Sequence, residues 1–463
     1  MLAPPTTPSD RQAPPSWCVP AIVVASLAVT ALYAGFGTGF VLDDWFTLGE
    51  GSVVGPFEAA GAGAARDRPG AYVVYLVVFG GLGAHPGAVL AFQGAVALAT
   101  GLVLFALVRR FVAAELAAAT AIVWVLLPSH TSLEVWASAS NIAVALLALL
   151  VGLLVLVDAG SDRGWALGGA VLAVGVLCYE AVLPAAVVGA VALPWLRDGA
   201  PRWRAAAFGV GGPALATLWI LAHWHDDKQA GGLTDLSQVV GGNLGWGIAP
   251  DGVLADVLAL VALVGIAVAV GRLALERTRR RAGPGEAMVL VGVVVAVLGA
   301  VPFAFYFYAP LGAGDRFNVV SAVGAALIWT GIGAMAWRVR RELALAGAAL
   351  LVVGAGPARW ERADRWSRAG ADALAILDAI EARWPEPPDH PIVLGPRPVQ
   401  EQNVAAFLDQ SNVRTAVQHL YGVSGVEVVL VFDQAAFDAA PEDQRLDIVE
   451  LSSLEATDEV EPT

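Results

Sequence analysis

Long apolar runs separated by short polar segments dominate the chain up to residue 356. About 20 apolar residues are enough to cross the hydrocarbon core of a bilayer. The run at 165–196 is too long for one ordinary crossing, and its interruption near Glu180 predicts two short helices that meet there. The pattern as a whole predicts eleven membrane spans, near residues 20–42, 86–108, 112–128, 135–157, 165–179, 181–196, 205–224, 252–271, 286–306, 318–337 and 342–356.

Arginine clusters between these runs predict the orientation of the chain. They follow the second, fourth, sixth, eighth and tenth predicted spans, as Arg109-Arg110 and Arg340-Arg341 illustrate. Cytoplasmic loops of membrane proteins carry an excess of Lys and Arg. We therefore predict a multi-pass protein of the cell membrane, with a cytoplasmic N-terminus and an extracytoplasmic C-terminus. Its Pro-rich leader, 1–19, shows no clear cleavage site, so the first span is expected to remain as an anchor.

Composition supports a membrane protein, since 57% of residues are hydrophobic and only 15% are charged. The net charge of −14 is uneven, because ten acids and one Arg follow from Asp433 onward. This balance argues against nucleic acid as a partner. Cys18 and Cys178 lie far apart, and we expect neither a disulfide nor a metal cluster from them.

The composition changes at Pro357, after the last apolar run. An amphipathic pattern predicts a helix over 359–384, and buried strands at 392–394 and 426–432 flank a helix expected over 403–421. We therefore predict a mainly α fold, a polytopic membrane bundle with a small extracytoplasmic α/β domain. The predicted boundaries are 20–356 for the membrane domain, 357–440 for the small domain and 441–463 for an acidic, disordered tail.

The predicted outer loop, 43–85, begins with two adjacent acids, Asp43 and Asp44. Such a pair at the membrane face is either a solvated helix end or a carboxylate poised to accept a proton or hold a metal. Pro69–Gly83 is apolar but too short to cross, so we expect an interfacial helix with Tyr72 and Tyr75 at headgroup level. Arg66 and Arg68 precede this helix, and either could clamp a lipid phosphate or snorkel to the interface.

Three further polar positions fall on the same predicted side of the membrane. His130 and Glu134 are four residues apart, so on a helix they would share one face and could pair. Tyr179-Glu180 and Asp315-Arg316 are the other two positions. Ionisable groups at membrane depth are costly, so their collection at one rim indicates a site. The alternative is that each is a helix cap or a solvated group.

Together and in this order, these segments resemble the C-type glycosyltransferases, membrane enzymes that use polyprenyl-phosphate sugars. The resemblance is nearest to the transmembrane O-mannosyltransferase-like branch and its bacterial relatives. Those proteins carry an acidic pair after the first helix and an Arg-Pro step, which Arg68-Pro69 matches. Their His- and Lys-Glu-containing segments look like Leu127–Trp136 and Tyr179–Pro184, and their Arg-Tyr step looks like Arg316-Phe317. Tyr179 replaces the Lys, Phe317 replaces the Tyr, and no tetratricopeptide array follows.

The resemblance implies transfer of a sugar from a polyprenyl-phosphate donor to an extracytoplasmic glycan, lipid or protein, next to membrane lipid. It implies a general base at Asp44 or Asp43, and donor-phosphate binding by Arg68 and Arg316, with Arg66 as a further candidate. It also implies a group that shapes the site, namely His130, Glu134, Tyr179, Glu180 and Asp315. Of these, His130, Glu134 and Glu180 could also help to hold Mg²⁺ or Mn²⁺.

Other classes of protein remain as alternatives at this point. A transporter or flippase of lipid-linked saccharides predicts charges at mid-bilayer and a repeated half, and the sequence has neither. A polymerase or ligase of such saccharides would work through Arg and His on large outer loops, which His223–Asp251 resembles. The departures at Tyr179 and Phe317 keep a catalytically inactive family member among the alternatives.

Overall fold

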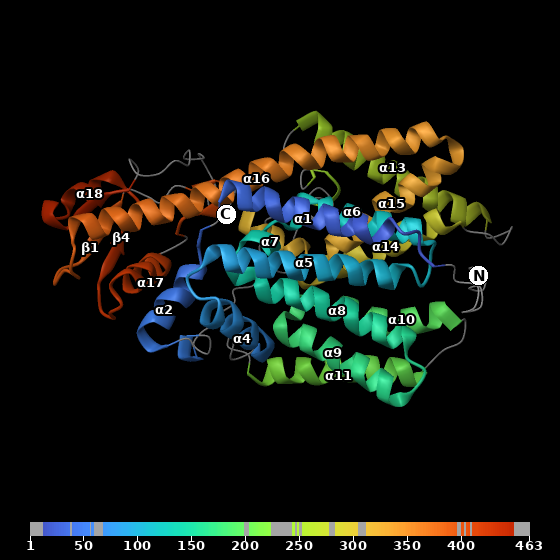
Figure 1. The fold of residues 1–463 in the computed structure, drawn as a ribbon, viewed down its shortest axis with the longest axis horizontal. Helices are drawn as coiled ribbons and strands as arrows, with labels where there is room; N and C mark the ends of the chain where they lie inside the picture. The colour runs from blue at the N-terminus through green and yellow to red at the C-terminus, as the bar shows by residue number, and fades with distance from the viewer. Residues whose placement is uncertain are drawn as a thin grey trace.

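The computed structural model is an elongated bundle of helices with a small α/β domain at one end (Figure 1). The structure describes residues 13–448 except 38, 56, 60–67, 199–202, 224–242, 246–247, 250–251, 277–282, 304–311, 396–399, 402–403 and 408–409.

Each of the eleven predicted spans corresponds to one helix of the structure. These helices are α1 Cys18–Phe36, α5 Pro86–Val108, α6 Ala114–Leu126, α8 Ser140–Asp158, α9 Asp162–Cys178, α10 Leu183–Asp198, α11 Trp203–Ala222, α13 Gly252–Glu276, α14 Pro284–Ala300, α15 Ser321–Val339 and α16 Arg341–Arg383. Among the described residues, eight helices are long and apolar enough to cross a membrane. The three shorter ones are α6, α9 and α10. The chain is therefore a multi-pass membrane protein, and its long apolar run does divide at Tyr179-Glu180.

Small residues let the helices of the bundle approach closely. Gly212 of α11 lies against the backbone of Gly169 in α9, where an added Cβ would overlap the Gly169 carbonyl. In α14 and α15, a Cβ at Gly292 would come within 2.7 Å of the Gly324 carbonyl oxygen. Lipid offers apolar side chains no hydrophobic gain from pairing, so close backbone packing of this kind holds transmembrane helices together.

The outer loop departs from its predicted form in two ways. Helix α1 ends at Phe36, before the predicted end at residue 42, because Gly37 has a φ of +84° that continues no helix. Asp44 then begins a new helix, α2 Asp44–Val54, so the acids do not sit on the end of the first span. The short helix predicted from Pro69 is present as α4 Pro69–Tyr75 and a π-helical turn, η2 Leu76–Gly81.

Helix α16 joins two elements that the sequence separates at Pro357. It runs without a break from Arg341 to Arg383 and contains Pro357 in its interior. Its first part is apolar enough to cross a membrane, and its last part leads into the small domain. In Figure 1 it forms one edge of the molecule and reaches the α/β domain. The two parts are therefore mechanically continuous.

The small domain contains a three-stranded parallel sheet in the order β4-β1-β5. Ile392 pairs with Val428, and Val393 pairs with Arg445. Strand β5 lies beyond residue 440, so the sheet extends past the predicted end of the domain. The helix expected over 403–421 begins only at Gln410, after a short antiparallel pair. The elements are β1 Ile392–Gly395, β2 Gln400–Glu401, β3 Val404–Ala405, α17 Gln410–Tyr421, β4 Val428–Leu430, α18 Gln434–Ala439 and β5 Arg445–Asp447.

The two ends of the described chain are separated along the bundle. Figure 1 shows the N-terminal end at one extreme and the small domain at the other, with α2 and α4 at the same end as the domain. Which end faces the cytoplasm stays a prediction from the arginine clusters.

Candidate functional site

The two acids of the doublet have different environments. Asp44 is fully buried, and its Oδ1 accepts hydrogen bonds from the backbone N–H (2.7 Å) and the hydroxyl (2.6 Å) of Ser138. Its Oδ2 accepts a third from the N–H of Val41 at 3.2 Å. Burial raises the pKa of Asp44 to about 7, although these hydrogen bonds oppose the shift. Asp43, its neighbour, is exposed. Asp44 thus holds two segments together, and Asp43 is accessible to a substrate.

Short helical turns between α6 and α8 supply the partner of Asp44. These turns are η3 Pro128–His130, α7 Ser132–Val135 and η4 Ala137–Ala139. The Ser138 carbonyl also accepts a hydrogen bond from the Tyr75 hydroxyl at 3.0 Å. Tyr75 therefore points into the protein, and its position at headgroup level stays a prediction. Ser138 therefore bonds to both Asp44 and Tyr75, two residues of the outer loop.

Arg316 lies on η7 Gly312–Asn318, immediately before α15. It is half-buried, and its guanidinium carbon lies 4.8 Å from the ring centre of Trp136 and 5.2 Å from that of Phe317. Stacking on aromatic faces holds a guanidinium in place while leaving its N–H groups free to bind an anion. Among the described residues, Arg316 has no hydrogen-bonded acid.

Arg68, the residue before α4, is paired with Glu180. Its Nε donates to Glu180 Oε2 at 2.6 Å and its second guanidinium nitrogen donates to Oε1. The Arg68 guanidinium also lies 5.4 Å from the ring centre of Tyr179. Burial opposes the charged form of Arg68, but Glu180 outweighs it and raises the pKa above its ordinary value. Arg66 lies outside the described residues.

The side chains near Tyr75 and Tyr179 show that the doublet and the two arginines share one region. Burial raises the pKa of Tyr75; Arg68 and Arg316 oppose this shift, and Asp43 and Asp44 add to it. The contacts agree, because Tyr75 and Asp44 both bond to Ser138, and Arg316 stacks on Trp136, two residues before Ser138. Burial also raises the pKa of Tyr179 to about 12, opposed by Arg316 and Arg68 and reinforced by Glu180. The structure therefore brings these predicted site residues to one place.

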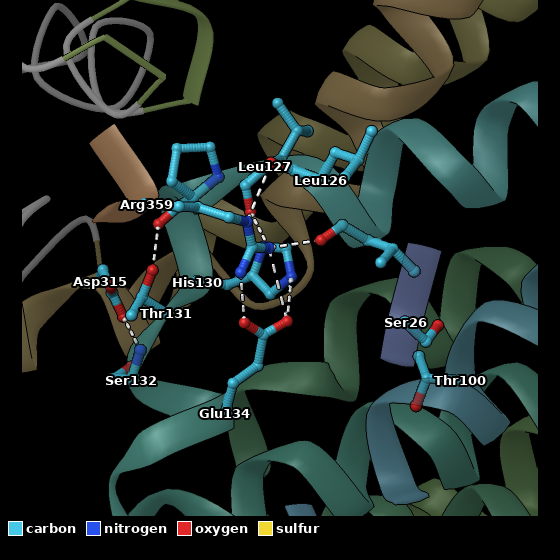
Figure 2. A network of polar contacts seen from close by, with 12 residues as sticks. Ser26, Thr100, Leu126, Leu127, His130, Thr131, Ser132, Glu134, Asp315 and Arg359 are labelled. Carbon is cyan, nitrogen blue, oxygen red and sulfur yellow. Dashed lines mark hydrogen bonds and ion pairs between the residues drawn. The ribbon is translucent and has the colours of Figure 1, made fainter. Parts of the chain in front are cut away.

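His130 and Glu134 belong to a different group, centred on Arg359 of α16 (Figure 2). Arg359 donates to Glu134 Oε2 at 2.5 Å and to the Tyr33 hydroxyl at 2.6 Å. It also donates to the carbonyls of Val125, Leu126 and Leu127 at the end of α6. His130 stacks on Trp124 with ring centres 4.8 Å apart, and its Nε2 lies 3.8 Å from Glu134 Oε1. All of these charged side chains are buried.

Asp315 belongs to the same group as Arg359, His130 and Glu134. Its Oδ1 accepts a hydrogen bond from the N–H of Ser132 at 2.9 Å, as Figure 2 shows. Burial raises the pKa of Asp315 to about 6, and Arg362 of α16 opposes the shift. Arg362 itself donates to the Pro128 carbonyl. Asp315 and Arg316 are adjacent in sequence, yet Asp315 bonds to the backbone at Ser132 and Arg316 stacks on Trp136 and Phe317.

Sequence reasoning missed Arg359 and Arg362 and treated α16 as two separate elements. Arg359 and Arg362 directly follow an apolar run, and a charged side chain close to the membrane needs a partner. Their position in the sequence therefore indicates that they are paired inside the protein. The partner could not be named, because Glu134 lies 225 residues earlier in the chain. The predicted pair of His130 and Glu134 exists, but Arg359 is the main partner of the carboxylate.

The predicted metal ligands do not fit a divalent cation. Glu134 is held by Arg359 and Glu180 by Arg68, so neither carboxylate presents free oxygens. In the described part of the chain, no three His, Cys, Asp or Glu side chains are grouped as metal ligands. A cation held by oxygen ligands needs several of them.

Comparisons with known proteins identify the fold. No family model matches the sequence, and a search of curated proteins finds no match. Among solved structures, the chain is similar to ArnT from Cupriavidus metallidurans bound to undecaprenyl phosphate, with a TM-score of 0.50 and 15% sequence identity. The alignment covers 94% of this chain and 90% of that chain. The fold is therefore the C-type glycosyltransferase fold, as the sequence predicted.

Proposed function

We propose that this protein is a membrane glycosyltransferase that moves a sugar from a polyprenyl-phosphate donor to an acceptor outside the cytoplasm. The observation that supports it most directly is the shared region around Tyr75, whose hydroxyl bonds to Ser138 beside Asp44 and whose pKa is affected by Asp43, Arg68 and Arg316 together. Transfer from a phosphate leaving group needs a base for the acceptor and positive charge for the departing phosphate. The region around Tyr75 supplies both a carboxylate and positively charged side chains.

An apolar cavity of about 580 Å³ supports a lipid-linked donor. It lies between α5, α8, α10, α14 and α15, and its lining includes Leu146, Val294 and Val320. Val320 closely follows Arg316 in the chain, so a phosphate at Arg316 would place the start of a prenyl chain near the cavity. The ArnT structure contains undecaprenyl phosphate, a lipid of this chemical class.

In the proposed reaction, the acceptor hydroxyl oxygen bonds to the anomeric carbon of the sugar while the bond from that carbon to the phosphate oxygen breaks. The acceptor proton passes to the Asp43 carboxylate. The polyprenyl phosphate leaves with its electron pair, and Arg316 and Arg68 bind its negative charge. No step uses a metal ion. Asp44 holds the neighbouring base, Asp43, in position, because its three hydrogen bonds fix it to Val41 and Ser138.

The finer features of the proposal follow from the sequence. They are the extracytoplasmic position of the small domain, the cytoplasmic N-terminus, and the kinship with the O-mannosyltransferase-like branch. The acceptor class, whether glycan, lipid or protein, also belongs to this proposal. Arg68-Pro69 and the segment around Trp136 carry the kinship.

The test is transfer from radiolabelled polyprenyl-phosphate sugars by purified protein in vesicles. Asp43→Asn removes the proposed base, so transfer should fall by ~10²–10⁴-fold. Glu50→Gln neutralises another acid on α2 and should leave the rate unchanged. Full activity of Asp43→Asn would overturn the proposed base. Label that crosses the vesicle membrane or leaves the lipid without a new glycosidic product would favour a transporter over a transferase, and no label movement at all would favour an inactive protein.

A further inference from the structure

We propose that the C-terminal part of the chain, from α16 through α17, positions the acidic doublet for reaction. This inference rests on the proposed function, because it assumes that the doublet supplies the base. Figure 1 shows α17 beside α2, although the two helices come from opposite ends of the sequence. Three contacts support the proposal. They lie before, at and after Asp43-Asp44, and the partner in each is a residue beyond 360.

The first contact precedes the doublet. The Ser367 hydroxyl of α16 donates to the carbonyl of Phe36, the last residue of α1, at 2.6 Å. One turn further along α16, Gly370 faces Gly39, and a Cβ on Gly370 would lie 2.8 Å from the Gly39 Cα. Real Cβ atoms essentially never come so close to backbone. The two backbones therefore meet only because both residues are glycine.

The second contact is at the doublet itself. Leu42 has a φ of +53°, and no other non-glycine residue in the described part of the chain has a positive φ. Its N–H donates to the carbonyl of Ala406 at 3.1 Å, and its side chain is buried. A leucine in this conformation is strained, and it persists only where the surroundings impose it. Here the C-terminal domain supplies part of that constraint, immediately before Asp43.

The third contact follows the doublet. Helix α2 packs on α17 so closely that a Cβ on Gly49 would overlap the Thr415 carbonyl. Trp45, the residue after Asp44, lies 6.2 Å from the ring of Phe407 and 6.2 Å from that of His419, measured between ring centres. The doublet is thus bracketed at Phe36–Leu42 and at Trp45–Gly49. Displacement of a reacting group by as little as 1 Å can lower a rate by about 10²-fold.

The experiment compares Gly370→Ala with Gly356→Ala in full-length protein reconstituted in vesicles. Both glycines are on α16, but a Cβ at Gly356 has no neighbour within 4 Å. Gly370→Ala should lower kcat by about 10²-fold, while KM for the lipid donor changes little, because Arg68 and Arg316 are not on the displaced segment. Gly356→Ala should leave both constants unchanged. A KM increase with kcat unchanged, or equal effects of the two variants, would overturn the proposal.

Hydrogen exchange gives a readout that does not depend on activity. In wild type, peptides containing the Leu42 amide should exchange slowly, and Gly370→Ala should speed this exchange while Gly356→Ala does not. Unchanged exchange in Gly370→Ala would contradict the proposed contact. If the wild type transfers no sugar, the proposed function fails, and the exchange data still decide whether α16 and α17 hold the doublet.

A milder variant guards against misfolding of Gly370→Ala. Ser367→Ala removes only the hydroxyl that bonds to Phe36. It should lower kcat by about fivefold, in line with the loss of one hydrogen bond. A kcat equal to that of the wild type in Ser367→Ala, together with unchanged exchange at Leu42, would also contradict the proposal.

Discussion

Two groups of arginines and carboxylates at the domain end of the bundle differ in how fully the protein satisfies them. Arg359 and Glu134 have side chains only 4% and 6% exposed, and Arg359 has bonds to a carboxylate, a hydroxyl and three carbonyls. Arg316 is half-buried against two aromatic rings, and the exposed Asp43 lies in the same region. Arg359 directs its hydrogen bonds to the protein, whereas Arg316, among the described residues, has no hydrogen-bonded acid.

This difference separates structural charges from candidates for chemistry. A buried ion pair with every partner in place fixes the geometry of a fold, and removing one member leaves a costly buried charge. A guanidinium held by stacking keeps donors for an anion. His130 and Glu134, which the sequence places among the site-shaping residues, belong to the structural group. They hold the turns that present Ser138 and Trp136 to the doublet and to Arg316.

The largest expected effect comes from breaking the structural group. Arg359→Met leaves the Glu134 carboxylate buried without its cation, and it should destabilise the protein by about 3–5 kcal/mol. Thermal unfolding of purified protein in detergent would measure the loss. The double variant Arg359→Met, Glu134→Leu should recover part of the stability, since no buried charge is left. A single variant as stable as wild type would show that the pair is not structural.

Changing the second group should affect activity and spare stability. Arg316→Ala removes the charge that is proposed to bind the leaving phosphate, so transfer should fall by about 10²–10³-fold. Arg316→Lys should restore only part of the rate, because Lys lacks the planar guanidinium that stacks on Trp136. Arg110→Ala, which breaks an exposed pair with Asp158, is the matched control and should retain activity. Loss of folded protein in Arg316→Ala would erase the distinction between the two groups.

A further expected effect is a pH dependence of stability from Asp44. Its pKa is about 7 in the folded protein and 3.8 ordinarily, so the folded state binds this proton more tightly than the unfolded state. The resulting stabilisation is complete below pH 4 and is lost as pH rises to about 7. The unfolding temperature of wild type should therefore fall more steeply than that of Asp44→Asn over this window.

Other groups titrate in the same range, so the comparison must be a difference between two curves. Asp315 has a raised pKa and acts in the same direction, whereas burial lowers the pKa of His130, which acts in the opposite direction. Both groups are present in wild type and in Asp44→Asn, and they cancel in the difference. Parallel curves would show that Asp44 is already ionised in the fold.

The sequence predicted the elements well because a membrane helix is a local structure. In lipid every backbone hydrogen bond must be made within the segment, so an apolar run of sufficient length becomes a helix whatever its neighbours. The division at Glu180, the short helix from Pro69 and the strands at 392 and 428 follow from such local patterns. The errors lie where local signals are weak, as at Pro357, where packing of α16 outweighs the proline.

By itself, the sequence determined the fold class and the segments that carry the charged side chains. Only the tertiary structure decided which charges meet. Glu134 pairs with Arg359 and Asp44 bonds to Ser138 across 225 and 94 residues of sequence. Packing between distant helices determines these partners, because a buried charge is stable only where the fold places a counterpart beside it. The same packing set Asp43, and not Asp44, in reach of a substrate.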